Sequence, residues 1–219
     1  RPKGASVQLT LAGQSITITG IAKGAGMIKP NMATMLAYVA TDAEISATRL
    51  QTLVSTAAEC SFNRITVDGD TSTNDAAMLV ATGASDLDID GLSAEEQTRF
   101  ELALIEVFIS LAQQVIRDGE GATKFVTVRV TGGGDSAECL AVAYTVAESP
   151  LVKTALFASD PNWGRILAAI GRAGIADLNV DAIQVYLDDV LIAENGGRAD
   201  SYTEQLGQSV MSQEEITIE

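Results

Sequence analysis

The 219-residue sequence contains no histidine. Without an imidazole, the chain has no Ser-His-Asp or Cys-His catalytic arrangement of its own, and no His-ligated metal site. Nucleophilic catalysis by this chain therefore requires a different base. The two cysteines, Cys60 and Cys139, lie in apolar contexts without CxxC spacing. This pattern predicts reduced core residues rather than a disulfide or zinc site, and we expect no metal and no cofactor.

Positive charge is also scarce, because 14 Lys and Arg face 29 Asp and Glu, for a net charge of −15. Nucleic acids and anionic membrane surfaces are bound by clustered Lys and Arg, so we expect neither as a partner. No signal-peptide pattern is present, and no segment approaches the roughly 20 apolar residues that span a bilayer. We therefore expect a cytoplasmic protein. Its acidic surface would attract a cationic small substrate, but the charge alone favours the simpler interpretation of an acidic surface that keeps the protein in solution.

Hydrophobic residues make up 47% of the chain, which is enough for a sizeable core. Alternating apolar residues predict a hairpin over 7–18 that turns at Gly13, and a second hairpin over 183–193. Further strands are expected at 34–40, 65–67, 76–81, 125–130 and 216–219. The strands at 34–40 and 76–81 are compact apolar runs and are expected to be buried.

Apolar residues at helical spacing predict helices at 46–60, 93–119, 136–148, 165–173 and 203–211. Ser93 and Glu96 form a capping-box pair at the start of the longest helix, and Gly119 is expected to end it. Helices and strands alternate loosely without an internal repeat, which predicts a layered α/β fold. The polar loop near 84–92 is the candidate domain boundary.

The glycine-rich segment KGAGMIKPNMATML, residues 23–36, leads from a loop into an apolar strand. No Lys-Ser/Thr pair follows its last glycine, so it is not a phosphate-binding P-loop. The hydroxyl of Thr34 could attack the carbonyl carbon of Ala33, and hydrolysis of the resulting ester would leave Thr34 as a new N-terminus. Its α-amine, with a pKa of about 7.7–8.0, could then activate its own hydroxyl. On local evidence alone, an ordinary threonine at the start of a strand is the simpler interpretation.

The acidic segment DGDTSTND, residues 68–75, has a spacing that partly resembles a calcium-binding EF-hand loop. Thr73 occupies the position where that loop needs glycine, and Leu79 the position of its bidentate glutamate. Calcium is therefore rejected. A network of side-chain turns that rigidifies the loop is the favoured interpretation.

Two further segments combine charged and turn-forming residues. In RDGEGATK, residues 117–124, Glu120 is either an exposed acid after a helix or a carboxylate that holds an amine. In SDPNWGRI, residues 159–166, Trp163 is expected to anchor the core. Asp160 and Arg165 are candidate supporting residues, and Arg165 suits either bidentate pairing with a carboxylate or a surface ion pair.

Together, and in this order, the four segments resemble the recurring motifs of the ornithine acetyltransferase family of arginine biosynthesis, the glutamate N-acetyltransferases. Residues 23–36 are similar to that family's self-cleavage motif. The resemblance covers essentially the whole chain, and it favours Thr34 as a nucleophile over an ordinary threonine. It implies a stacked α-β-β-α sandwich similar to self-processing N-terminal-nucleophile enzymes.

The resemblance also implies autoproteolysis between Ala33 and Thr34. Residues 1–33 would then be the C-terminal end of the family's α chain, and residues 34–219 would belong to the β chain. We accordingly expect a hetero-oligomer of cleaved α and β chains.

The family's reaction moves an acetyl group from N-acetylornithine to the threonine hydroxyl and then to glutamate. Some members also accept acetyl-CoA, which would then be a substrate rather than a cofactor. By motif position, Thr34 is the nucleophile, and Lys23 and Glu120 line the substrate site. Lys23 would pair with a substrate carboxylate and Glu120 with an amine.

Two features of the family are absent from the sequence. Residues 1–33 contain no Thr-Thr-Gly oxyanion motif, and the sequence up to Glu219 does not include the family's Asn- and Thr-containing tail. The 219 residues are therefore expected to supply part of an active site. Two alternatives stay open: a related self-processing aminopeptidase or amidohydrolase, in which water replaces glutamate, and an inactive fragment that binds amino acids.

Overall fold

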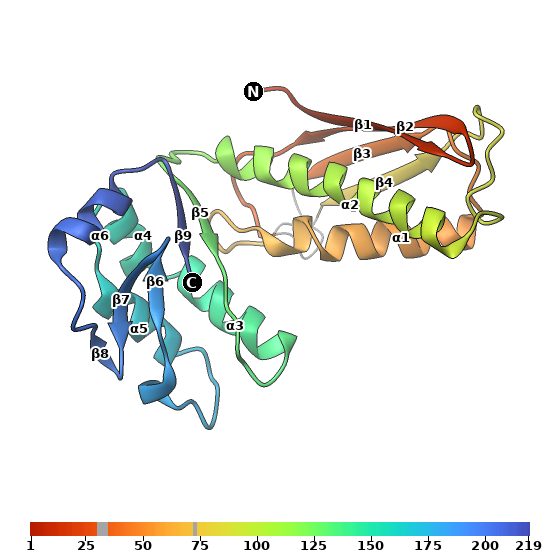
Figure 1. Cartoon of the computed structure of the whole chain (residues 1–219). Helices are drawn as coiled ribbons and strands as arrows, with labels where there is room; N and C mark the ends of the chain where they lie inside the picture. Colours follow the sequence, from red (N-terminus) through yellow and green to blue (C-terminus); the bar gives the residue numbers. More distant parts are fainter. Residues whose placement is uncertain (30–34, 72–73) are drawn as a thin grey trace. The chain divides into compact units, whose positions relative to one another are not determined.

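The computed structural model describes residues 1–29, 35–71 and 74–219 (Figure 1). The chain divides into two compact units, Arg1–Glu120 and Gly121–Glu219. Each unit has its own β-sheet and its own hydrophobic core. The predicted α/β class is confirmed by these two sheets and the helices that pack on them.

The first unit contains a four-stranded sheet with the order β1-β2-β3-β4. Its strands are β1 (Lys3–Leu11), β2 (Gln14–Lys23), β3 (Leu36–Thr41) and β4 (Ala76–Ala81). The first three strands pair antiparallel, whereas β3 and β4 pair parallel. The predicted first hairpin is confirmed: Ala12 and Gly13 form its turn with φ of 46° and 77°, the left-handed conformation that two-residue hairpin turns require.

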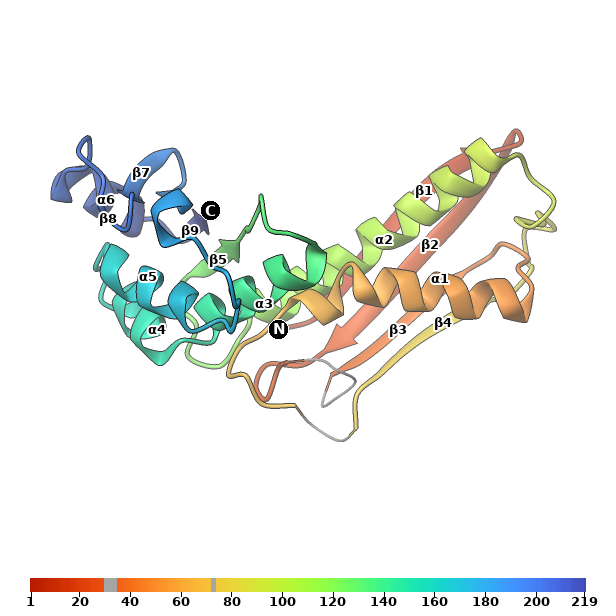
Figure 2. The same ribbon diagram turned by 90° about the horizontal axis from the view of Figure 1, so that it is seen from below.

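Helices α1 (Ala47–Glu59) and α2 (Ala94–Arg117) cover one face of this sheet (Figure 2). The predicted capping box is present, because the Ser93 hydroxyl accepts from the Glu96 amide and donates to its carboxylate. The buried face of α2 packs against inward residues of β1 and β2. The largest fully buried side chains of this core include Ile16, Ile18, Phe62, Phe100, Leu104, Phe108 and Leu111.

The opposite face of the sheet is exposed. Strand register places Ile21, Tyr38 and Met78 in one row across β2, β3 and β4, and these side chains are 62%, 46% and 44% exposed. The prediction that 34–40 and 76–81 are buried strands is therefore wrong for their outward residues. The strands exist, but each alternates between a helix-covered face and an open one.

The second unit contains a five-stranded sheet with the order β5-β9-β6-β7-β8. Its strands are β5 (Phe125–Val128), β6 (Val185–Leu187), β7 (Val190–Glu194), β8 (Gly197–Arg198) and β9 (Glu215–Ile218). Its helices are α3 (Ser136–Ala147), α4 (Pro150–Phe157), α5 (Trp163–Gly171) and α6 (Glu204–Met211). Trp163 is half-buried and packs against the core of this unit, as predicted. Among the described residues, no helix is long and apolar enough to cross a membrane.

Several predicted features differ in the structure. Residues 65–67 form no strand; a 3-10 helix, η1 (Phe62–Arg64), comes before them, and the Val67 amide donates to the carbonyl oxygen of Ile28 at 2.6 Å. A second 3-10 helix, η2 (Val180–Ala182), and helix α4 were not predicted. Helix η2 has three residues and α4 has eight, so both are too short for a sustained helical pattern. Cys60 is exposed rather than buried in the core, Cys139 is half-buried, and both are free.

The predicted boundary at 84–92 is also wrong, since this loop is part of the first unit. The amide of Glu44 donates to Leu87, and the amide of Ile89 donates to Glu44. Leu87 and Ile89 are 5% and 0% exposed and belong to the core. The boundary instead follows Glu120.

Candidate active site

Three of the four sequence segments meet in the first unit. Lys23 is the last residue of β2 and pairs with Leu36, the first residue of β3. Residues 24–35 therefore connect two neighbouring antiparallel strands. Ala33 and Thr34, the predicted cleavage site and nucleophile, lie outside the described residues.

Asp68 joins the acidic segment to the glycine-rich segment. Its carboxylate accepts hydrogen bonds from the amides of Met27 at 2.6 Å and Ile28 at 3.1 Å. It also accepts from the amide of Asp70 at 3.0 Å, which confirms the predicted side-chain turn. No local pattern in the sequence indicates that the same carboxylate binds a segment about 40 residues earlier. Met27 has φ of 52°, so this carboxylate holds a backbone in the left-handed region.

Asp75 makes a similar connection to Met35, which follows the nucleophile segment, residues 30–34, in the sequence. Its Oδ1 accepts a hydrogen bond from the amide of Met35, and the amide of Ala76 donates to the carbonyl oxygen of Met35 at 3.0 Å. Register explains the contact, because Leu36 and Ala76 are partners in the parallel β3-β4 pair. The residue before each strand therefore lies beside its counterpart.

Glu120 follows helix α2 and reaches the same loop. Its amide donates to the carbonyl oxygen of Ala25 at 2.7 Å. A Cβ built on Gly26 would lie 3.0 Å from Oε2 of Glu120, so this carboxylate lies directly against the glycine. Helix α2 ends at Arg117 with Asp118 as its C-cap, so Gly119, the predicted stop residue, directly follows the cap.

A Lys3–Asp118 ion pair anchors the end of α2 to β1. The ammonium of Lys3 donates to Oδ2 of Asp118 at 2.6 Å, and the lysine side chain is 5% exposed. The hydrogen bond from the Lys3 ammonium lowers the pKa of Asp118 below its ordinary value. Glu120, two residues later, thus extends from a fixed helix end. Lys3 lies on the inward-facing side of the alternating pattern of β1, so its burial could have been predicted from the sequence.

Lys23 is exposed at the end of β2. It directly precedes the loop whose Ala25 and Gly26 contact Glu120. Lys23 and Glu120, the two predicted substrate-binding residues, therefore lie at the same end of the first unit. Lys23 directly precedes this loop in the chain, and Glu120 contacts it.

The fourth segment lies in the second unit, where its contacts are local. The side chain of Asn162 caps α5 by accepting from the Arg165 amide, and it donates to Asp160 at 3.0 Å. Arg165 donates to the carbonyl oxygen of Leu151 and the hydroxyl of Thr154 at 3.0 and 2.9 Å. The partners shown for Arg165 are thus neutral oxygens of α4, whereas the sequence suggested a carboxylate.

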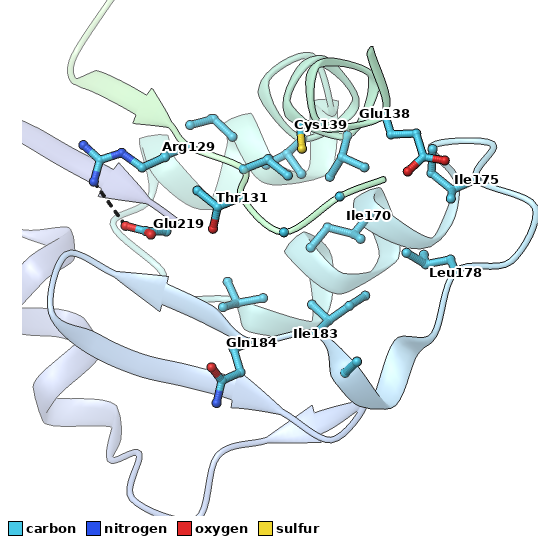
Figure 3. A pocket seen from close by; sticks show the side chains of 18 of the residues that line it. Arg129, Thr131, Glu138, Cys139, Ile170, Ile175, Leu178, Ile183, Gln184 and Glu219 are labelled. Atoms are coloured by element: carbon cyan, nitrogen blue, oxygen red, sulfur yellow. Dashed lines mark hydrogen bonds and ion pairs between the residues drawn. The ribbon is translucent and has the colours of Figure 1, made fainter. Parts of the chain in front are cut away.

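A cavity of about 520 Å³ also lies in the second unit (Figure 3). Ile170, Ile175, Leu178 and Ile183 contribute to an aliphatic wall. An exposed ion pair between Arg129 and Glu219 spans 3.2 Å at its rim. The cavity belongs to the second unit, whereas the contacts of Asp68, Asp75 and Glu120 belong to the first. The described residues contain no cluster of three or more Cys, Asp or Glu placed to hold a metal ion.

The sequence is similar to known proteins along its whole length. The model of the ArgJ family matches residues 1–219. The chain is 62% identical over 218 residues to the arginine biosynthesis bifunctional protein ArgJ of Pseudomonas fluorescens, and 60% identical over 220 residues to the protein of that name from Psychrobacter arcticus. Each match covers 99% of this chain but 54% of the relative, so the chain spans about half of their length.

A solved structure is similar as well. The crystal structure of the arginine biosynthesis bifunctional protein ArgJ from Bacillus halodurans superposes with a TM-score of 0.77 at 37% identity. The match covers 84% of this chain and 86% of that chain. The likeness therefore extends to three-dimensional structure.

Proposed function

The chain belongs to the ArgJ family, and on that premise we propose that it forms part of a self-cleaving glutamate N-acetyltransferase of arginine biosynthesis. The donor would be N-acetylornithine and the acceptor glutamate. The observation that carries the proposal is the hydrogen bonding of residues 67–71, 75–76 and 120 to residues 25–29 and 35, which flank the segment that bears Thr34 in the sequence.

Maturation would begin with an attack of the Thr34 hydroxyl on the carbonyl carbon of Ala33. The peptide C–N bond would break as the proton moves to nitrogen, and water would then hydrolyse the ester. The products are the carboxylate of Ala33 and a Thr34 with free amine and hydroxyl. This supplies a base to a chain that has no histidine.

Acetyl transfer would follow in two steps. The amine of Thr34 accepts the hydroxyl proton as the oxygen attacks the acetyl carbonyl of N-acetylornithine, and ornithine leaves with that proton. The neutral amine of glutamate then attacks the acetyl-threonine ester, its proton passes through the Thr34 amine to the threonine oxygen as the ester C–O bond breaks, and N-acetylglutamate departs. Both steps pass through an oxyanion, for which a single hydrogen-bond donor contributes about 10²–10³ in rate.

Glu120 and Lys23 are proposed to bind the substrates. N-acetylornithine has a free side-chain amine that glutamate lacks, and the exposed carboxylate of Glu120 suits it. Lys23 would pair with the carboxylate that both substrates share. Asp160 and Arg165 stay candidates for a supporting role in the second unit.

The remaining elements of the enzyme are proposals too. Because the chain spans 54% of its relatives' length, the oxyanion donors and further substrate contacts would come from residues outside it. We propose a hetero-oligomer of cleaved α and β chains in the cytoplasm, which needs no cofactor. Acetyl-CoA as an alternative donor is a further expectation.

Product analysis tests the proposal in the natural protein that contains these residues. Incubation with N-acetylornithine and excess glutamate should yield N-acetylglutamate in amounts equal to the ornithine released, and Thr34→Ala should yield none. Release of free acetate regardless of glutamate would instead identify an amidohydrolase. Absence of any turnover by the cleaved wild-type protein would favour an inactive amino-acid-binding protein.

A further inference from the structure

Two aspartates of one loop bind the two described flanks of the nucleophile segment. Asp68 accepts from the amides of Met27 and Ile28, before the segment. Asp75 accepts from the amide of Met35, directly after Thr34 in the sequence. The 68–75 loop therefore contacts the chain on both sides of the predicted cleavage site.

Backbone hydrogen bonds reinforce both connections. The amide of Val67 donates to the carbonyl oxygen of Ile28 at 2.6 Å, and the amide of Ala76 donates to that of Met35 at 3.0 Å. Each aspartate therefore lies next in the chain to a residue that makes a backbone hydrogen bond to the same flank: Val67 beside Asp68, and Ala76 beside Asp75. Between them, the hydroxyl of Thr71 donates to the carbonyl oxygen of Lys29 at 3.2 Å.

The hydrogen bonds from Met27, Ile28 and Met35 go beyond those that shape the 68–75 loop itself. A turn-forming aspartate binds an amide about two residues on, as Asp68 does with Asp70. The bonds to Met27 and Met35 instead span 41 and 40 residues. Hydrogen bonds from amides to carboxylates are also shorter and about twice as strong as neutral ones, so they restrict their partners more.

We propose that Asp68 and Asp75 are positioning residues for the chemistry of Thr34. They hold the two flanks of its segment so that the hydroxyl attacks the Ala33 carbonyl during self-cleavage, and the substrate acetyl group afterwards. Neither aspartate takes part in bond making. This inference rests on the proposed function, because it needs Thr34 to be the nucleophile.

The expected effect follows from the sensitivity of intramolecular attack to orientation. A displacement of about 1 Å at the reacting atoms can cost about 100-fold in rate. Asp75 binds the residue next to Thr34, so its loss should have the larger effect. Asp68 binds residues further away along the chain, so its loss should have a smaller one.

The test follows self-cleavage of the natural protein after cell-free synthesis by intact mass spectrometry. Asp75→Asn keeps an acceptor oxygen but loses the charge, whereas Asp75→Ala loses both, and the same pair is made at Asp68. Asp70→Ala is the matched control, since Asp70 is exposed on the same loop and contributes its amide to Asp68. Thermal unfolding is measured for every variant.

We expect cleavage to slow by about tenfold or more in Asp75→Ala, with Asp75→Asn intermediate, at unfolding temperatures equal to that of Asp70→Ala. In cleaved protein, kcat should fall while KM for glutamate stays unchanged. Cleavage at the wild-type rate in both alanine variants, or slowing matched by Asp70→Ala, would overturn the inference. The proposed function fails separately, if wild-type protein is not cut or Thr34→Ala still is.

Discussion

The amide of Glu120 donates a hydrogen bond to the carbonyl oxygen of Ala25, with 2.7 Å between the nitrogen and the oxygen. This bond fixes the backbone that follows helix α2 against the glycine-rich loop. It explains how a carboxylate far from the loop in sequence comes to lie against Gly26. The same contact makes the role of Glu120 open to experiment.

Substitution Glu120→Gln should weaken the use of N-acetylornithine but not of glutamate. A charged hydrogen bond contributes about 1.5–3 kcal/mol, so KM for N-acetylornithine should rise by at least about tenfold. Steady-state kinetics with each substrate varied in turn gives the two constants. Glu106→Gln makes the same change in charge at an exposed position of α2 and is the control. An equal rise in both KM values would argue against an amine-binding role.

Gly26→Ala should disturb the carboxylate of Glu120 without destabilising the fold. The added Cβ would stand 3.0 Å from Oε2 of Glu120, and this flexible side-chain end can move away. We expect KM for N-acetylornithine to rise while the unfolding temperature stays within error. Gly171→Ala adds its methyl group where no atom lies within 4 Å, and serves as the control. Unchanged kinetics in Gly26→Ala would mean that the orientation of Glu120 does not matter.

The Lys3–Asp118 ion pair should make stability depend on pH in the acid range. Because its carboxylate accepts a hydrogen bond from Lys3, Asp118 has a folded-state pKa below the ordinary value of 3.8. A carboxyl group with a lowered pKa stabilises the folded state at pH values above its pKa in the unfolded chain. This stabilisation is lost as the pH falls through its pKa in the folded chain.

Urea unfolding of wild type and Asp118→Asn should therefore differ by a constant amount above pH about 4. The difference in free energy of unfolding should shrink as pH falls below about 4, because protons then bind the carboxyl more readily in the unfolded chain than in the folded one. A difference that stays the same throughout this range would show that the pair does not act through the charge of Asp118.

Gly20→Ala should destabilise the first unit by overpacking its core. A Cβ at Gly20 would lie 2.8 Å from Cγ2 of Val39 and 2.9 Å from Cδ1 of Leu111. Overpacking of this kind costs about 1–3 kcal/mol. Gly4→Ala is the matched control in the adjacent strand, where an added Cβ would lie 3.7 Å from the carbonyl oxygen of Gly20, an ordinary van der Waals distance. Equal unfolding free energies for the two variants would contradict the packing described here.

Local features of the fold could be predicted from the sequence, whereas contacts between distant segments could not. Ser93 and Glu96 lie three residues apart, so the start of α2 can be predicted from the sequence. The 84–92 loop looked like a boundary because it is polar. Its hydrogen bonds to Glu44 depend on the sheet order, which no local pattern encodes.

The candidate site divides in the same way. Glu120 and Lys23 were identified through the resemblance of their motifs to a family. Asp68 was predicted only as a turn residue, because its bonds to Met27 and Ile28 join segments about 40 residues apart. The prediction for Arg165 considered charged partners, whereas its observed partners are set by the packing of α4 against α5.

Intact mass spectrometry of the natural protein, before and after incubation with N-acetylornithine, tests most directly whether Thr34 is a self-generated nucleophile. Wild-type protein should appear as two chains divided between Ala33 and Thr34, and the substrate should add one acetyl group to the chain that begins with Thr34. Thr34→Ala should remain a single chain without acetyl. Cleavage that persists at this bond in Thr34→Ala, or an acetyl group on a different residue, would contradict the assignment.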